Sequence, residues 1–120
     1  MKQPTTKIVR GKMGENLAVE YLTNKGFHIL DRNYRYERGE VDIVAEDNNV
    51  LVFIEVKARH TKMFGEPEDA VTPSKRVKIR KIADGYLFKH DIDDRECRFD
   101  IIAIDYQQQK PVIRHIENAF

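Results

Sequence analysis

The sequence predicts a single α/β domain in which a central mixed β-sheet is flanked by helices. Two stretches, residues 13–25 and 73–87, repeat apolar side chains at the spacing of amphipathic helices. Between and after them lie short runs that are rich in Val and Ile and bounded by Gly, Asn or Pro, as β-strands are. We therefore expect the element order α-β-β-β-α-β-β, which is an αβββαβ core followed by an extra C-terminal strand.

The composition is that of an ordinary water-soluble domain. At 120 residues the chain is long enough for one core, and 41% of its residues are hydrophobic against 34% charged. The formal net charge of +1 gives no global attraction to a polyanion, so any nucleic-acid surface must be a local patch. Cys97 is the only cysteine, which excludes an internal disulfide and a multi-thiolate metal site. With no apolar leader and no run of membrane-spanning length, we expect a cytoplasmic protein without membrane association.

The first twelve residues are polar, and we expect them to form a flexible N-terminal arm ahead of one domain that spans residues 13–120. The first helix is expected over residues 13–25, before Gly26, with an apolar stripe of Leu17, Ala18, Tyr21 and Leu22. Glu15 borders this stripe near the expected helix start. Its carboxylate either belongs to a functional site or simply favours the positive end of the helix dipole.

A first strand is expected over residues 27–35, and its end is both basic and aromatic. Arginines and tyrosines are interleaved from Arg32 to Arg38, a pattern that suits contact with a phosphate backbone and an unstacked base. A solvated loop whose tyrosines lie on the sheet edge explains the same pattern without a ligand. The arginines that we assign to a nucleic-acid surface are Arg32, Arg35, Arg38 and Arg59.

The sequence is organised around a hairpin with strands over residues 41–45 and 50–56. A two-residue turn at Asn48-Asn49 pairs positions whose numbers sum to 97, which places Asp42 directly opposite Glu55. Lys57 shares a strand face with Glu55 because side chains alternate along a strand. Opposed like charges destabilise a sheet, and a bound cation resolves the conflict. The alternative is a structural ion cluster in which Lys57 bridges the two acids.

The second helix has a clear start, with Thr72 as N-cap and Pro73 at its first position. The preceding Gly- and Pro-containing loop, residues 60–67, is a candidate flap. Residues 98–106 and 112–116 should form the last two strands. The first turns of the helix carry basic residues without an acidic partner four residues away: Lys75, Arg76, Lys78, Arg80 and Lys81. Such a run is either a solvated face or a surface for nucleic-acid phosphates.

These motifs resemble those of the YraN-like family of small bacterial proteins, within the PD-(D/E)xK nuclease superfamily. The resemblance covers residues 13–116 and rests on Gly14-Glu15, Arg32-Asn33, GEVD at 39–42, FIEVK at 53–57 and Phe64-Gly65. It implies a restriction endonuclease-like fold, related to that of archaeal Holliday-junction resolvases. By resemblance, Glu15, Asp42 and Glu55 match the metal-site carboxylates and Lys57 the catalytic lysine. Val41 stands where the superfamily name has Pro.

Phosphodiester hydrolysis needs the residue types that this hairpin supplies. A hard cation neutralises charge in the transition state and lowers the pKa of an attacking water. Mg²⁺ or Mn²⁺ prefers oxygen ligands, which Asp42, Glu55 and the main-chain carbonyl of Val56 offer. The ammonium of Lys57 would orient the water or stabilise charge on the phosphate. We assign Asp42, Glu55 and Lys57 as the catalytic residues.

We therefore expect a Mg²⁺- or Mn²⁺-dependent endonuclease that acts on DNA, with branched DNA as a candidate substrate. Two other functions remain open from the sequence. One is a nucleic-acid-binding module of the same fold with little turnover, and the other is an interaction protein whose acidic hairpin is structural. Resolution of a junction needs two symmetrically placed sites, so the resemblance also implies a homodimer.

Overall fold

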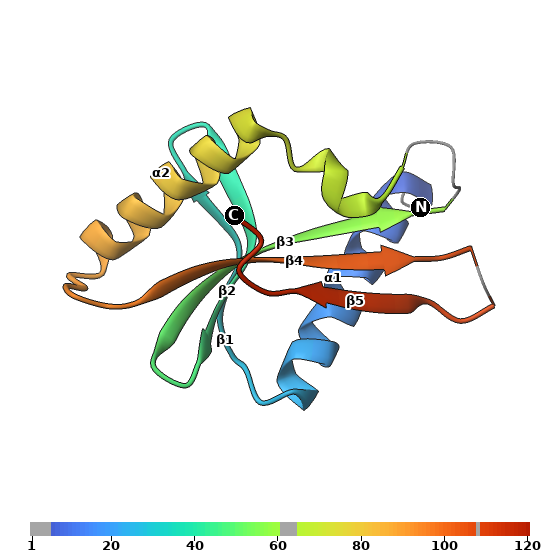
Figure 1. Cartoon of the computed structure of the whole chain (residues 1–120), viewed down its shortest axis with the longest axis horizontal. Helices are drawn as coiled ribbons and strands as arrows, with labels where there is room; N and C mark the ends of the chain where they lie inside the picture. The colour runs from blue at the N-terminus through green and yellow to red at the C-terminus, as the bar shows by residue number, and fades with distance from the viewer. Residues whose placement is uncertain (1–5, 61–64, 108) are drawn as a thin grey trace, which may run out of the picture.

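The computed structural model describes residues 6–60, 65–107 and 109–120 and shows helices packed on a five-stranded sheet (Figure 1). The strand order is β1-β2-β3-β4-β5, in which β3 and β4 are parallel and the other neighbours antiparallel. The predicted mixed sheet and αβββαβ core with an extra C-terminal strand are confirmed. In chain order the elements are α1 (Thr6–Asn24), β1 (His28–Tyr36), β2 (Gly39–Asp47), β3 (Val50–Arg59), the 3₁₀ turn η1 (Pro67–Ala70), α2 (Pro73–Lys89), β4 (Cys97–Asp105) and β5 (Val112–Ile116).

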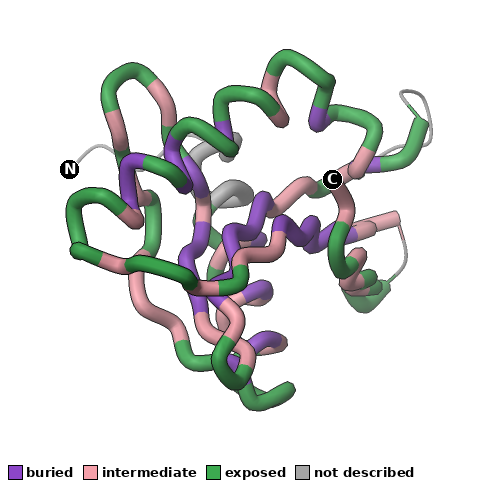
Figure 2. Tube along the Cα trace, turned by 60° about the vertical axis from the view of Figure 1, so that its left-hand side comes forward, coloured by how far each residue is buried: buried purple, intermediate pink, exposed green. Residues whose placement is uncertain are grey.

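The two long helices cover opposite faces of the sheet, and each face has its own apolar cluster. The cluster under α2 contains Phe53 and Tyr86, and the cluster under α1 contains Leu22 and Ile54. In Figure 1, α1 passes behind the strands, and in Figure 2 the buried segments gather in the interior while exposed ones lie at turns and on outer helix surfaces. None of the described helices is long and apolar enough to cross a membrane.

Helix α1 begins at Thr6 rather than at Met13, so residues 6–12 are helical where the sequence predicted a flexible arm. The predicted helix start is based on the first residues of the apolar stripe, but a helix extends beyond its apolar stripe until a residue breaks it. Gly11 does not break it, since one Gly costs a helix only about 1 kcal/mol. Residues 1–5 of the expected arm lie outside the described residues. The expected strands over 27–35 and 98–106 are confirmed with one-residue shifts, at His28–Tyr36 and Cys97–Asp105.

The central hairpin has the register that its turn residues predicted. Asp47 pairs with Val50 across the turn, and Asn48 adopts the positive φ, 56°, that such a turn requires. The N-cap of α2 is also as predicted, because the Thr72 hydroxyl accepts the Lys75 backbone N–H at 3.3 Å. These two local features fix the strands and the helix start that carry the candidate site.

The turn between β1 and β2 lies close to α2 because two glycines leave room for it. A Cβ on Gly39 would come within 2.8 Å of Cδ1 of Ile82, and one on Gly85 within 2.5 Å of Cε2 of Tyr36. Real Cβ atoms do not tolerate such distances. The two glycines therefore let residues 36–40 form a wall opposite α2.

Candidate functional site

The candidate site lies where β2 separates from β3, at Asp42 and Glu55. The backbone ladder between the two strands ends at the Ile43–Ile54 pair. Beyond this pair, a side chain takes the place of a backbone carbonyl as acceptor. Oδ2 of Asp42 accepts the Val56 backbone N–H at 2.8 Å. The backbone N–H of Asp42 donates to Oε1 of Glu55 at 3.3 Å. The structure thus brings the two predicted carboxylates together at a fork in the sheet.

A change of strand geometry places Asp42 at the boundary between the two faces. Its neighbours Val41 and Ile43 pack in the clusters under α2 and under α1, respectively. On a regular strand, residues two apart share a face. On β1, Asn33 lies between the partners of these two residues and has a φ of 53°, a left-handed conformation that Asn adopts more readily than most residues. The face of the sheet to which the side chains point therefore changes at Asn33 on β1 and at Asp42 on β2.

Both carboxylates are held in an environment that disfavours their charge. Glu55 is only 3% exposed, and Asp42 is half-buried. Burial, reinforced by the charge of Asp42, raises the pKa of Glu55 to about 7. Burial also raises the pKa of Asp42, although the hydrogen bond from Val56 favours its charged form. A positive charge close to the pair would favour the ionised form of both acids.

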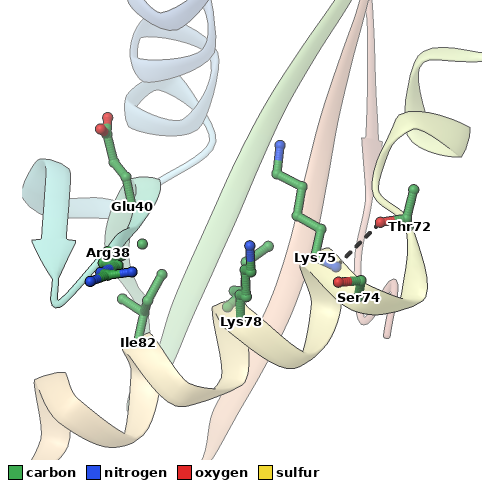
Figure 3. A pocket seen from close by; sticks show the side chains of 9 residues that line it. Arg38, Glu40, Thr72, Ser74, Lys75, Lys78 and Ile82 are labelled. Carbon is green, nitrogen blue, oxygen red and sulfur yellow. Dashed lines mark hydrogen bonds between the residues drawn. The ribbon is translucent and has the colours of Figure 1, made fainter.

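Two lysines from different elements face this pair. Lys57 follows Glu55 on the same face of β3, and Lys75 extends from the first turn of α2 (Figure 3) so that its Nζ lies 3.3 Å from Oε2 of Glu55. Burial, together with the neighbouring ammonium of Lys75, lowers the pKa of Lys57. Burial works against charge on Lys75 as well, but its contacts with Lys57 and Glu55 outweigh it and raise the pKa of Lys75. Lys75 is thus the firmly charged lysine of the two.

Glu15 lies beside the acid pair, on the α1 side. Its Oε1 accepts hydrogen bonds from Nε of Arg32 at 2.9 Å and from Nδ2 of Asn33 at 3.0 Å. Arg32 is held further by Oδ1 of Asn16 at 2.6 Å. The charge of Glu15 still reaches Asp42, where it adds to the effect of burial in raising the pKa. Because Glu15 is in the middle of α1 and not near its start, the helix dipole does not explain it.

Asp42 and Glu55 fit the ligand chemistry of a hard divalent cation. They offer carboxylate oxygens, and the repulsion and burial that raise both pKa values are what such a cation would offset. Within the described ranges, no three Asp, Glu, His or Cys side chains already lie at metal-binding spacing. Glu15 binds Arg32 and Asn33 through Oε1, and it would become a third ligand only if its side chain moved closer to the pair.

A groove between α2 and the β1–β2 turn leads to this site, and we call it the basic groove (Figure 3). It consists of two adjoining cavities of about 310 and 240 Å³ that share Arg38, Gly39, Lys78 and Ile82. Lys75 lies at the end next to Glu55, and Lys81 lines the second cavity. The buried side chains of Ile79 and Ile82 supply an apolar floor between the cations.

The structure divides the basic residues that the sequence grouped together. Arg38, Lys75, Lys78 and Lys81 line the groove. Arg76 and Arg80 lie elsewhere on α2, with their guanidinium carbons 5.4 and 5.9 Å from the ring centre of Phe120.

The other arginines that the sequence assigned to a nucleic-acid surface bind acidic side chains. Arg32 binds Glu15, Arg35 pairs with Glu40 at 3.2 Å, and Arg59 pairs with Asp105 at 2.9 Å and Glu66 at 3.3 Å.

A third cavity, of about 310 Å³, is separate from the basic groove, and its lining includes Lys57, Arg59, His60 and Pro67. The expected flap forms part of this border through Gly65, which has a φ of 78°. Residues 61–64 of the flap, including Phe64, lie outside the described residues.

Sequence reasoning missed the pairing of Lys75 with Glu55 and the role of Asn33. It found no acidic partner for Lys75 because it examined only the same helix, whereas the partner lies on β3. The Arg32-Asn33 motif did carry a signal, but only the structure shows that both side chains bind Glu15.

Comparison with known proteins gives consistent matches over most of the chain. A family model described as "Uncharacterised protein family UPF0102" matches residues 14–104. A UPF0102 protein of Alkaliphilus oremlandii is 47% identical over 112 residues, which cover 92% of this chain and 96% of the relative. Similar matches are a UPF0102 protein of Persephonella marina, 46% identical over 93% of each chain, and UPF0102 protein FP2501 of Flavobacterium psychrophilum, 43% identical over 92% of each chain.

Proposed function

Given that the chain belongs to the UPF0102 family, the YraN-like family that its motifs resemble, we propose that it is a metal-dependent endonuclease. It hydrolyses DNA phosphodiester bonds, and branched DNA is among its substrates. The observation that carries this proposal is the Asp42–Glu55 pair, set into a fork of the sheet beside Lys57 and at the end of the basic groove.

The cation would be Mg²⁺ or Mn²⁺, held by Asp42 and Glu55 with help from the Val56 carbonyl and, after rearrangement, Glu15. Such a cation neutralises charge on the phosphate and lowers the pKa of an attacking water. Asp42 is positioned for this by its hydrogen bond from Val56, which fixes one oxygen and leaves the other to bind.

Lys57 is the residue that would act on the reacting atoms. It is half-buried, and its lowered pKa brings its amine closer to a form that accepts a proton from the attacking water. In its charged form the same group would donate a hydrogen bond to the phosphate as negative charge develops. Either role fits a compact amine on the same strand face as a metal ligand.

The basic groove supplies a path for the DNA strand toward these residues. Arg38, Lys78 and Lys81 would contact phosphates along it, and the apolar floor suits a sugar or base. Arg76 and Arg80 would take no part, since they lie against Phe120. Cutting both strands of a junction would require two copies of this site, so a homodimer belongs to the proposal.

If DNA binds along the basic groove, two double variants that remove the same charge should differ in the salt dependence of DNA binding. Lys78→Gln/Lys81→Gln should lower the slope of log affinity against log salt by about 1.4 to 1.8, because about 0.7 to 0.9 counterions are released per phosphate contact. Arg76→Gln/Arg80→Gln removes the same charge from the same helix and should leave the slope unchanged. Fluorescence anisotropy of labelled DNA over a range of salt measures both. Equal slopes for the two variants would show that the groove does not guide DNA.

Cleavage of DNA tests the function itself. Wild-type protein with Mn²⁺ should nick or cut at least one of four labelled substrates: duplex, flap, four-way junction and single strand. Protein that carries Asp42→Asn and Glu55→Gln together, purified in the same way, should cut none. If wild type binds DNA but cuts no substrate with Mn²⁺ or Mg²⁺, the chain is a binding module of this fold. If it neither binds nor cuts DNA, the acidic hairpin is structural.

A further inference from the structure

Both oxygens of Glu55 are already engaged. Oε1 accepts the Asp42 backbone N–H at 3.3 Å, and Oε2 lies 3.3 Å from the ammonium of Lys75. Glu55 itself is 3% exposed, so water does not solvate it from another side. A cation that binds between Asp42 and Glu55 must therefore compete with Lys75 for the same oxygen.

The charge of the site leads to the same conclusion. Two carboxylates, Asp42 and Glu55, face two lysines, Lys57 and Lys75, while the charge of Glu15 is matched by Arg32. A divalent cation added to this arrangement would meet two ammonium groups at close range, and like charges repel strongly where solvent is scarce. The site accepts the cation readily only if one ammonium leaves.

Lys75 is the group that is free to leave. Its side chain is 36% exposed, whereas Lys57 is half-buried on a central strand. Its backbone is fixed by the Thr72 cap and can stay in place while the long side chain turns. The basic groove, which Lys75 also lines, offers the ammonium a place on the side of Glu40, the acidic side chain among the residues that line this cavity (Figure 3).

We propose that Lys75 is a resident counter-ion of Glu55 that a divalent cation displaces into the basic groove. This inference rests on the proposed metal-dependent function. The displaced ammonium adds a positive charge at the end of the groove nearest the acids, where a phosphate approaching the cation would lie. Binding of the cation thereby prepares the groove for the DNA backbone, and the apo protein keeps its buried carboxylate neutralised.

The test is the affinity for Mn²⁺ of DNA-free protein, measured by calorimetric titration on wild type, Lys75→Met and Lys78→Met. Removing the competing ammonium should tighten Mn²⁺ binding about tenfold, which is the order of effect that one nearby unit charge has on a binding constant. Lys78→Met removes an equal charge one turn further along the groove and should change the affinity little. Lys75→Gln serves as a second variant if Lys75→Met does not fold.

Each outcome is decisive. Tighter binding by Lys75→Met than by wild type, or binding by Lys75→Met alone, supports the displacement. Equal or weaker binding by Lys75→Met, when wild type binds, overturns it and leaves the metal site standing. Absence of binding by both proteins overturns the displacement and the metal-dependent function together.

Discussion

Lys57→Ala should reduce single-turnover cleavage of DNA by about a hundredfold or more, which is the usual cost of losing one charge-stabilising donor. Lys57 is not among the proposed metal ligands, and it lies outside the set of side chains that line the basic groove. Binding of Mn²⁺ and of DNA should therefore survive the change. Loss of rate without loss of binding is the signature of an interaction made mainly in the transition state.

Two comparisons make the Lys57 measurement specific. Lys57→Arg should not restore the rate, because a planar guanidinium cannot place its donors where a compact amine does. Lys78→Ala should weaken DNA binding but keep the rate at saturating DNA, since Lys78 lines the groove away from the acids. If Lys57→Ala cleaves as fast as wild type, the activity comes from another site or another protein.

Asp100→Asn should destabilise the metal-free protein by about 3 kcal/mol, the cost of removing one partner from a buried charge pair. Asp100 is fully buried, and its carboxylate accepts two hydrogen bonds from Arg98 at 2.9 and 3.0 Å. Its carboxylate is also bonded to Nε2 of His115 at 2.7 Å and accepts the backbone N–H of Asn118 at 2.9 Å. These partners outweigh burial and lower the pKa of Asp100, so its charged form is stabilised.

Glu55→Gln should have the opposite effect on metal-free protein, although Glu55 is the other buried acid of the described chain. Glu55 has a pKa of about 7, raised from 4.5, so the native state keeps a proton between these values that the unfolded state has lost. Wild-type stability therefore falls as the pH rises through this window. Glu55→Gln removes this loss, and the variant should equal or exceed wild type above pH 7.

Denaturant unfolding with EDTA between pH 2.5 and 8 compares the two variants. Asp100→Asn should lie below wild type at pH 8 and approach it as the pH falls below 3.8, through the lowered pKa of Asp100. The difference between Glu55→Gln and wild type should grow in favour of the variant from pH 4.5 to about 7. An equal loss of stability from both variants at pH 8 would mean that Glu55 is a structural acid like Asp100.

Local sequence signals predicted the parts of the fold that local geometry decides. Asn48-Asn49 specified a two-residue turn, and the turn fixed the register that brings Asp42 to Glu55. Thr72-Pro73 specified the start of α2 in the same way. Both signals work because a few residues with restricted backbone angles determine the outcome.

Contacts between distant elements could not be predicted in this way. The ion pair between Lys75 and Glu55 depends on how α2 packs on β3. The position of Arg76 and Arg80 outside the basic groove depends on where Phe120 lies. The position of Glu15 beside Arg32 depends on α1 crossing the other face of the sheet. Each needs the assembled layers, which a pattern of residue types in one segment does not contain.

The most direct test of the central claim is the thermal stability of wild type, Asp42→Asn and Glu55→Gln with and without Mn²⁺. Wild type should unfold at a higher temperature with Mn²⁺, because a ligand at a hundred times its Kd stabilises a protein by about 2.7 kcal/mol. Both variants should lose this shift. Glu40→Gln, which changes an exposed acid paired with Arg35 on the rim of the groove, should keep it. A Mn²⁺ shift of wild-type size in Asp42→Asn and Glu55→Gln would contradict a metal site at this fork of the sheet.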